Sequence, residues 1–584
     1  MLARFVIPAL CAPLTALAGA QNPPLRQLHV PVAMRDGIRL SANVFLPSEH
    51  GRYPAILIRT PYGKGTDLAP NWQALVEHGY AVVVEDVRGR YESEGAFAPL
   101  TQETSDGSDT LDWIARQTWS DGNAGMTGGS YLGIVQWKAA LSQNPHLKAI
   151  FPVVSGCDDY LDRFYSTGGA MKLGNRLEWM AENLRVPGFH TEFSQFVLHL
   201  PVRTADIAAT GASSDMYRQA MAHPAFDDFW RSISTREQIA KIRIPVFAVG
   251  GWYDNFVESD LAAFAALHIT SGLNRILVGP WPHNMSRPLE GVDFGPDARI
   301  PLRQLQLEWF DHWLMGKRAP LVSGPPVKFF VMGSNRWREG RQWPPENART
   351  RAWYLDSNGG ANTLSGDGLL AETPPHFRQR AGRDSFVYDP RDPPPTRGGA
   401  VCCNPDVFPW GPMDQRPVER RRDVLVFTSR PLVHDLEVAG PVKAVLYVST
   451  TAKDTDFTAK LVDVFPDGAA RNLTDGILRL RYRDSIEKPR PATPGDVYRI
   501  TVDAGVTANV FLKGHRIRLE IAAGNFPRFD RNLNTGGVVA DETRPVKATE
   551  TVWHDTRHPS QLELTVMPEG AGPAVVRAIA GPTR

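Results

Sequence analysis

Short apolar runs alternate with helical patterns in the first part of the chain, and this alternation restricts the fold more than any other feature. The runs AILIRT, AVVVED and LKAIFPVVS have the length and composition of buried strands. Helical periodicity stands between them, over residues 72–78, 109–116 and 131–141. Strands that alternate with helices form a mainly parallel sheet with helices on both faces. The sequence therefore predicts an α/β core, preceded by an antiparallel hairpin over residues 28–45.

With 584 residues, the chain is too long for a single hydrophobic core. The alternation stops near residue 156, where a helical segment rich in aromatic residues begins, and it resumes with IPVFAVGG and RILVGP. A segment inserted between two strands of such a core is well placed to cover a site. The predicted divisions are a signal peptide at 1–20, an α/β core at 21–156 and 241–350, a helical cap at 157–240 and a β-rich domain at 351–584.

The β-rich domain is predicted from short strands that recur with turns between them. DVLVFTS, PVKAVLYVST and DVYRITV are examples. Many short strands at this spacing indicate an all-β sandwich, and we expect a jelly roll. Asp467-Gly468 and Asp475-Gly476 are dipeptides typical of hairpin turns, so a hairpin is expected at each.

The first twenty residues read MLARFVIPALCAPLTALAGA. Arg4 supplies a positive charge, an apolar stretch follows, and Ala18-Gly19-Ala20 fits a cleavage site, which together predict a signal peptide. We therefore expect export to a periplasm or out of the cell, with no membrane association after cleavage. Lys and Arg number 64 against 63 Asp and Glu, so no basic excess favours binding to nucleic acid.

Four cysteines occur, and Cys11 would leave with the signal peptide. The others, Cys157, Cys402 and Cys403, have no metal-ligand spacing and are too few for a disulfide framework. Three alternatives stay open: the adjacent cysteines bond to each other, one of them bonds to Cys157, or all three are buried thiols. We expect no metal and no organic cofactor.

The stretch GMTGGSYLG places Ser130 between a buried run and a helical pattern. A nucleophilic serine of an α/β-hydrolase lies on such a sharp turn, between small residues. Gly128 and Gly129 relieve crowding at the turn. The usual pattern G-x-S-x-G is altered, since Leu132 replaces its second glycine and Gly133 follows one residue later. We predict that Ser130 is a nucleophile.

A serine hydroxyl needs a base, and the base needs an acid that orients it. In this fold both follow the serine, the acid before the histidine. GGWYDN places Asp254 just after one strand of the core, and GPWPHN places His283 just after the next. Because loops at the carboxyl edge of a parallel sheet converge, Asp254 and His283 are predicted to complete a triad with Ser130. The alternatives are a helix N-cap for Asp254 and an ordinary loop histidine for His283.

The oxyanion that forms during attack on a carbonyl needs hydrogen-bond donors. The N–H of Tyr131, directly after Ser130, is expected to supply one. The other is expected from RTPYGK, either from the hydroxyl of Tyr62 or from a backbone N–H nearby.

Five motifs in the order RTPYGK, EDVRGRYESEG, WSDGNAGMTGGSYLG, GGWYDNF and GPWPH resemble the cocaine esterase, X-Pro dipeptidyl-peptidase and α-amino acid ester hydrolase family of serine hydrolases. The resemblance is strongest to the cocaine esterase pattern and runs from about residue 30 to about residue 570. It implies an α/β-hydrolase core with a C-terminal jelly roll. It also implies Ser130 as nucleophile, His283 as base, Asp254 as its partner, and an oxyanion hole made by the Tyr62 hydroxyl and the Tyr131 N–H.

The resemblance also bears on the substrate. In the amino acid ester hydrolases of the family, two acids just after the triad aspartate help to hold the ammonium group of the substrate, whereas Phe256 and Val257 occupy those positions here. Asp158 and Asp159 are the candidates to compensate. The expected substrate is therefore a small ester, or an amide, with an apolar or aromatic acyl group.

Three aromatic residues near the predicted triad, Trp252, Phe256 and Trp281, are the expected walls of the substrate pocket; the alternative is that they pack under the loops. Two other functions stay open. An acylase or aminopeptidase, such as a β-lactam side-chain acylase or an X-Pro dipeptidyl-peptidase, would use the same three side chains. An exported carbohydrate-binding protein would use the jelly roll instead. A homo-oligomer is a further option for either.

Overall fold

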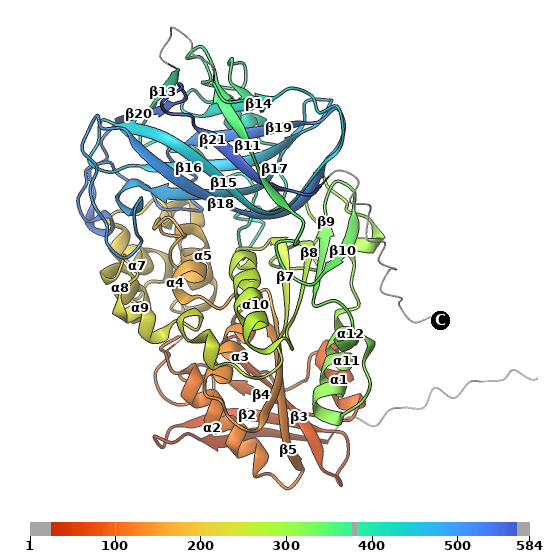
Figure 1. The fold of residues 1–584 in the computed structure, drawn as a ribbon. Helices are drawn as coiled ribbons and strands as arrows, with labels where there is room; N and C mark the ends of the chain where they lie inside the picture. Colours follow the sequence, from red (N-terminus) through yellow and green to blue (C-terminus); the bar gives the residue numbers. More distant parts are fainter. Residues whose placement is uncertain (1–24, 100, 376–381, 569–584) are drawn as a thin grey trace, which may run out of the picture.

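A computed structural model describes residues 25–99, 101–375 and 382–568. Two large sheets dominate this part of the chain (Figure 1). The predicted signal peptide lies outside the described residues. Within them, no helix is both long enough and apolar enough to cross a membrane.

The first sheet contains ten strands in the order β1-β2-β4-β3-β5-β6-β7-β8-β9-β10. The neighbours from β4 to β9 pair in parallel, whereas the pairs β1–β2, β2–β4 and β9–β10 are antiparallel. This arrangement confirms the predicted α/β core, including its leading hairpin. The strands are β1 (Leu25–Ala33), β2 (Arg39–Leu46), β3 (Tyr53–Thr60), β4 (Ala81–Asp86), β5 (Ser120–Gly129), β6 (Leu147–Val153), β7 (Phe247–Tyr253), β8 (Arg275–Pro282), β9 (Val327–Val331) and β10 (Arg336–Gly340).

Helices flank the first sheet, and a further group of helices forms the chain segment between β6 and β7, called the gap here although the two strands are neighbours in the sheet. Those outside the gap are α1 (Pro70–Glu77), α2 (Glu103–Ala115), α3 (Tyr131–Leu141), α10 (Val257–Ser271), α11 (Leu302–Met315) and α12 (Pro320–Ser323). Those in the gap are α4 (Asp159–Arg163), α5 (Leu173–Asn183), α6 (Phe193–Phe196), α7 (Ala205–Thr210), α8 (Asp215–Ala222) and α9 (Asp228–Ile233), with the 3₁₀ turns η1 (Val202–Thr204) and η2 (Arg236–Lys241). The latter group is called the helical insertion below.

The second sheet contains eleven strands, mostly antiparallel, as expected for a β-rich C-terminal part. Its order is β13-β20-β15-β21-β11-β12-β14-β19-β16-β17, with β18 paired to β15. The strands are β11 (Arg349–Asp356), β12 (Leu369–Ala371), β13 (Arg383–Tyr388), β14 (Leu425–Ser429), β15 (Leu436–Thr450), β16 (Asp456–Val464), β17 (Ala470–Arg479), β18 (Tyr498–Phe511), β19 (Arg516–Ala522), β20 (Ala548–Trp553) and β21 (Gln561–Val566).

One of the two predicted hairpin turns is wrong. Asp467-Gly468 lies between β16 and β17 as expected, but Asp475 and Gly476 lie inside β17, where they pair with Lys460 and Ala459 of β16. A glycine is required at Gly476 because a Cβ there would lie 1.8 Å from the carbonyl oxygen of Asp503. The dipeptide therefore reflects a close approach of two backbones and not a turn.

The helical insertion also contacts the second-sheet part of the chain, as its position in Figure 1 indicates. The Gly174 N–H donates to the carbonyl of Pro527 at 2.8 Å, and the Met171 N–H donates to the Asp530 carboxylate at 2.8 Å. Gly168 pairs with Leu478 of β17. These contacts hold the start of α5 and the segment just before it against the second-sheet part of the chain.

Arg59 of β3 ties the first sheet to α2 through ion pairs that are shielded from water. Its Nε donates to Glu85 at 2.7 Å, its Nη1 donates to Glu103 at 2.6 Å, and its side chain is completely buried. Thr110 donates to the second oxygen of Glu85 at 2.9 Å. Even with Arg59 beside it, burial raises the pKa of Glu85 to about 7.

Replacing Arg59 with methionine should strongly destabilise the protein. Arg59→Met would leave two buried carboxyl groups without their cation, and breaking a buried pair costs about 3–5 kcal/mol. Arg116→Met, at an exposed position after α2, is the control and should change the free energy of unfolding by less than about 0.5 kcal/mol. Urea denaturation measures both; equal stability of the two variants would contradict this role of Arg59.

Candidate active site

Ser130 occupies the sharp turn between β5 and α3. Its backbone angles are φ 56° and ψ −126°, a conformation that costs an L-residue energy and that persists only when its surroundings enforce it. Gly128 has φ +137°, and a Cβ there would lie 2.5 Å from that of Leu132. A Cβ on Gly133 would lie 2.4 Å from Ser155, so the displaced glycine of the motif is needed where β6 ends.

Asp254 and His283 follow two neighbouring parallel strands, β7 and β8, at the same edge of the sheet as Ser130. His283 Nδ1 lies 2.7 Å from Asp254 Oδ1, and Asp254 Oδ2 accepts the N–H of Phe256 at 3.3 Å. The Asp254 carboxylate is fully buried, so it is oriented and shielded from water. With Nδ1 held by Asp254, His283 Nε2 is the nitrogen that can accept a proton.

No hydrogen bond joins Ser130 Oγ to His283 among the described residues. Contacts of this kind are often long in a substrate-free site and shorten in the complex with substrate. The geometry therefore places the three predicted triad residues at one edge of the sheet, with the acid–base pair bonded and the nucleophile separate.

The hydroxyl of Tyr62 lies beside Ser130, where it was predicted to act as an oxyanion donor. Trp179 of α5 donates its indole N–H to Tyr62 Oη at 3.1 Å. Burial raises the pKa of Tyr62, although the hydrogen bonds from Trp179 and Ser130 act in the opposite direction. The phenol therefore stays protonated at neutral pH and keeps a proton to donate.

The backbone N–H of Tyr131 lies at the start of α3, where the helix dipole favours negative charge. The Tyr131 side chain is buried, and its hydroxyl donates to Glu103 at 2.8 Å. Its ring stacks on Trp179 with 6.3 Å between centroids and 8° between planes. The hydrogen bond to Glu103 and the stacking on Trp179 thus hold Tyr131, the residue after the predicted nucleophile, in place.

A cavity next to Ser130 is lined by residues from three parts of the chain. The core contributes Tyr62 and Phe256, the helical insertion contributes Phe164, Arg176 and Trp179, and the second-sheet part contributes Cys402 and Cys403. Phe256 also packs edge-on against His283 at 5.5 Å between ring centroids.

Two of the three expected pocket walls lie elsewhere. Trp252 is buried against Trp343, and its indole N–H donates to the carbonyl of Phe330. Trp281 packs on Trp337 and donates to the carbonyl of Ala298. Both rings point into the core beneath the loops because their N–H groups find backbone acceptors there. Phe256 is the one expected wall that lines the cavity.

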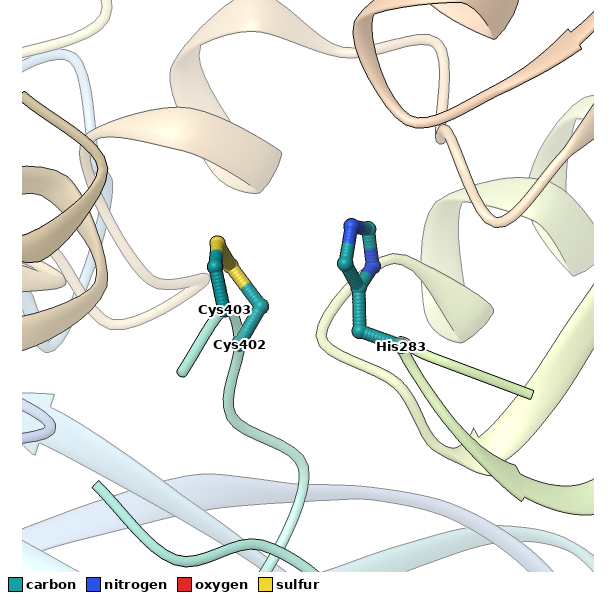
Figure 2. Close-up of side chains that lie close together, drawn as sticks. All are labelled: His283, Cys402 and Cys403. Atoms are coloured by element: carbon teal, nitrogen blue, oxygen red, sulfur yellow. A yellow bond between two sulfur atoms is a disulfide. The ribbon is translucent and has the colours of Figure 1, made fainter. Parts of the chain in front are cut away.

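Cys402 and Cys403 form a disulfide with each other, while Cys157 is a buried free thiol. Figure 2 shows the disulfide facing the ring of His283, and the sulfurs and an imidazole nitrogen lie within 4.8 Å of one another. Metal ions bind thiolates, which a disulfide does not offer. In this state the pair therefore acts as an apolar wall of the cavity.

Several lining residues were not recognised from the sequence. Phe164 and Trp179 line the cavity, but they belong to the aromatic-rich segment of the sequence, in which other rings, such as Trp230, pack against one another. Arg163 and Arg176 carried no signal, because an arginine in a helical segment is usually exposed. Adjacent cysteines were the available signal for Cys402 and Cys403, and they did not indicate proximity to His283.

Comparisons with known proteins agree with this geometry. Residues 36–285 match the family model of the X-Pro dipeptidyl-peptidase (S15 family), and residues 322–563 match that of the X-Pro dipeptidyl-peptidase C-terminal non-catalytic domain. A cocaine esterase of Rhodococcus sp. (strain MB1 Bresler) is 38% identical over 570 residues, which cover 92% of this chain and 98% of the esterase.

Solved structures with the same architecture include an aminopeptidase from a marine sediment archaeon, Thaumarchaeota archaeon. Its TM-score is 0.83 at 26% identity, over 97% of this chain and 99% of that one. An α-amino acid ester hydrolase has a TM-score of 0.81 at 25% identity, over 95% of this chain and 100% of that one.

Fold and relatives together define the protein as a serine hydrolase of the carboxylic ester class. More particularly, the chain belongs to the family of cocaine esterase and the X-Pro dipeptidyl-peptidases.

Chemical modification of the disulfide should inactivate the enzyme. Reduction followed by iodoacetamide would add two bulky groups at Cys402 and Cys403 inside the cavity, so we expect loss of ester hydrolysis. The unreduced protein should resist the same reagent. Cys157→Ala is the control: its inactivation should be unchanged, since burial shields Cys157 and raises the pKa of its thiol. Peptide mapping locates the adducts; full activity with both cysteines modified would contradict the placement of the pair.

Proposed function

We propose that the protein hydrolyses an ester bond, or an amide bond, through Ser130, His283 and Asp254. The observation that carries the proposal is the strained Ser130 turn beside the bonded Asp254–His283 pair, at the ends of adjacent parallel strands. A small molecule is the partner; no metal or organic cofactor takes part in any step.

In this mechanism, His283 Nε2 takes the Ser130 proton as Oγ attacks the carbonyl carbon. Asp254 holds the imidazole through Nδ1 and stabilises its protonated form. The imidazolium then gives its proton to the leaving alcohol, which departs and leaves an acyl-enzyme. Water, deprotonated by His283, cleaves that ester and regenerates Ser130.

The negative oxygen of each tetrahedral intermediate would be held by the Tyr62 hydroxyl and the Tyr131 N–H. Trp179 supports this role by bonding to Tyr62 Oη and by stacking on the Tyr131 ring. Both donors are therefore held in place before the charge develops, which is what makes such donors effective.

We further propose an acyl group that is largely apolar or aromatic, in keeping with the lining by Phe164, Trp179 and Phe256. An α-amino acyl group is disfavoured, because the two acids that could have compensated are engaged elsewhere. Asp158 caps α4 and lies 3.0 Å from Arg236, and Asp159 pairs with Lys138 and Arg163.

Among the alternatives, an acylase or aminopeptidase stays the second candidate, supported by the likeness to an aminopeptidase and to an α-amino acid ester hydrolase. A carbohydrate-binding function finds no support in the relatives named above. Export remains our proposal from the first twenty residues alone, as does the option of a homo-oligomer.

Ser130→Ala should abolish turnover of aryl esters and leave the fold intact. A fluorophosphonate probe should label the wild-type protein at Ser130 and leave the variant unlabelled. Circular dichroism checks folding, and mass spectrometry locates the label. Undiminished turnover by the purified variant would refute Ser130 as the nucleophile.

Tyr62→Phe should lower kcat by roughly 10²- to 10³-fold, the usual cost of one oxyanion donor. The ring, its burial and its packing are kept, so only the hydroxyl is tested. Steady-state kinetics with one aryl ester suffice. A loss well below tenfold would mean that Tyr62 only packs beside the site and that a backbone N–H donates instead.

A further inference from the structure

We propose that the cavity binds a carboxylate on the acyl part of the substrate, and that Arg176 is the residue that selects it. The inference rests on the proposed ester hydrolysis and names its substrate class. The acyl group would be apolar near the ester bond and would carry one negative charge further along, as in half-esters of dicarboxylic acids.

Arg176 lies on α5 and lines the cavity that contains Ser130. Its Nε and Nη2 both donate to the carbonyl of Arg163, at 3.2 and 3.1 Å. Its Nη1 has no acceptor among the described residues, and no carboxylate there lies within 4.0 Å of any of its nitrogens. The guanidinium is therefore oriented by the protein but not neutralised by it.

The aromatic residues around Arg176 hold the cation in place. Its guanidinium lies over the ring of Phe164 at 4.6 Å and over that of Trp179 at 5.4 Å. Burial and the nearby charge of Arg163 lower the pKa of Arg176 to about 10, so the group remains cationic at neutral pH. Arg176 is partly buried, and a cation withdrawn from water without a counter-ion at contact distance is costly, so a bound anion would reduce that cost.

The acidic groups of the cavity do not balance this charge. Arg163 is compensated by Asp159, whose carboxylate lies at 3.3 Å. Asp162 also lines the cavity, but it accepts the N–H of Asp158 at 2.7 Å and lies 3.8 Å from Arg163, and burial raises its pKa to about 7. Its partial charge is thus shared with Arg163 and leaves Arg176 uncompensated.

A second donor points to the same kind of ligand. Asn175, adjacent to Arg176 on α5, is nine-tenths buried and lines the cavity. Its Oδ1 accepts the N–H of Cys402 at 3.4 Å, whereas its Nδ2 has no hydrogen-bond partner within the described ranges. An amide N–H beside an uncompensated guanidinium suits a carboxylate, which accepts at both oxygens.

The residues around Arg176 indicate that the substrate carboxylate belongs to the acyl part and not to the leaving group. The leaving group has to lie at His283, which returns the proton to it. Arg176 lies over the ring of Trp179, which bonds to the Tyr62 hydroxyl and stacks on Tyr131, so it lies on the oxyanion side of the site. Apolar Phe164 and Met216 line the same cavity and would contact the hydrocarbon part of the acyl group.

The test compares esters that differ only in charge. 4-Nitrophenyl hydrogen adipate and hydrogen isophthalate carry the carboxylate on the acyl part, and their methyl esters are the neutral controls. Phenyl butyrate and 4-carboxyphenyl butyrate place the difference on the leaving group instead. We expect the wild-type enzyme to favour an acyl carboxylate by about 10- to 100-fold in kcat/KM, the usual contribution of a charged hydrogen bond.

Arg176→Met should reduce that ratio to about 1, chiefly through KM, because the lost contact is made in the ground state and the transition state alike. Arg176→Lys keeps the positive charge but lacks the planar guanidinium that can donate two parallel hydrogen bonds, so it should retain part of the preference. Arg185→Met removes an exposed positive charge just after α5 and should leave the ratio unchanged.

Several outcomes would overturn the proposal. These are a wild-type ratio near 1, an equal loss on charged and neutral esters in Arg176→Met, or a preference confined to the leaving-group carboxylate. If Arg176→Met fails to fold, the wild-type ratio and inhibition by isophthalate against isophthalamide decide the question. Failure of the proposed function is distinct, since then no ester of the set is hydrolysed in a manner that depends on Ser130.

Discussion

The buried guanidinium of Arg59 connects the centre of the α/β core to the proposed oxyanion donors. It pairs with Glu103, whose other oxygen accepts the hydroxyl of Tyr131, the residue that follows the nucleophile. The Tyr131 ring stacks on Trp179, and Trp179 bonds to the hydroxyl of Tyr62. The links from Arg59 to Tyr131 are buried, so water does not compete for those hydrogen bonds, whereas the bond from Trp179 to Tyr62 is partly buried. A charge pair in the core thereby orients groups at the edge of the sheet.

The backbone at Ser130 illustrates how the sequence motif follows from packing. A residue with these angles costs about 1–3 kcal/mol, which the surroundings must offset. The absence of a side chain at Gly128 leaves room for Leu132, and its absence at Gly133 leaves room for Ser155. The second glycine is displaced by one residue because it is Gly133 that lies against the chain just after β6. The unusual spacing between Ser130 and Gly133 is thus explained by the close approach of the chain after β6 to the first turn of α3.

Periodicity and chain order predicted the α/β core, the position of Ser130 between strand and helix, and the strand ends that carry Asp254 and His283. These features depend on local patterns and on the geometry of parallel sheets, which a sequence displays directly. For Trp252 and Trp281 the sequence left two positions open, lining the pocket or packing under the loops, because proximity in sequence to Asp254 or His283 does not show on which side of a loop a ring lies. Arg176 and Cys402 were missed because the cavity joins segments more than two hundred residues apart, and no local pattern reports such a contact.

The Cys402–Cys403 pair belongs to the long connection between β13 and β14, which carries none of the groups proposed to react. The wall facing His283 is therefore supplied by a segment that contributes no strand to the first sheet. Such an arrangement separates the evolution of selectivity from the preservation of chemistry. It gives a reason why enzymes of one architecture could diverge in the molecules they accept while their reaction stays the same.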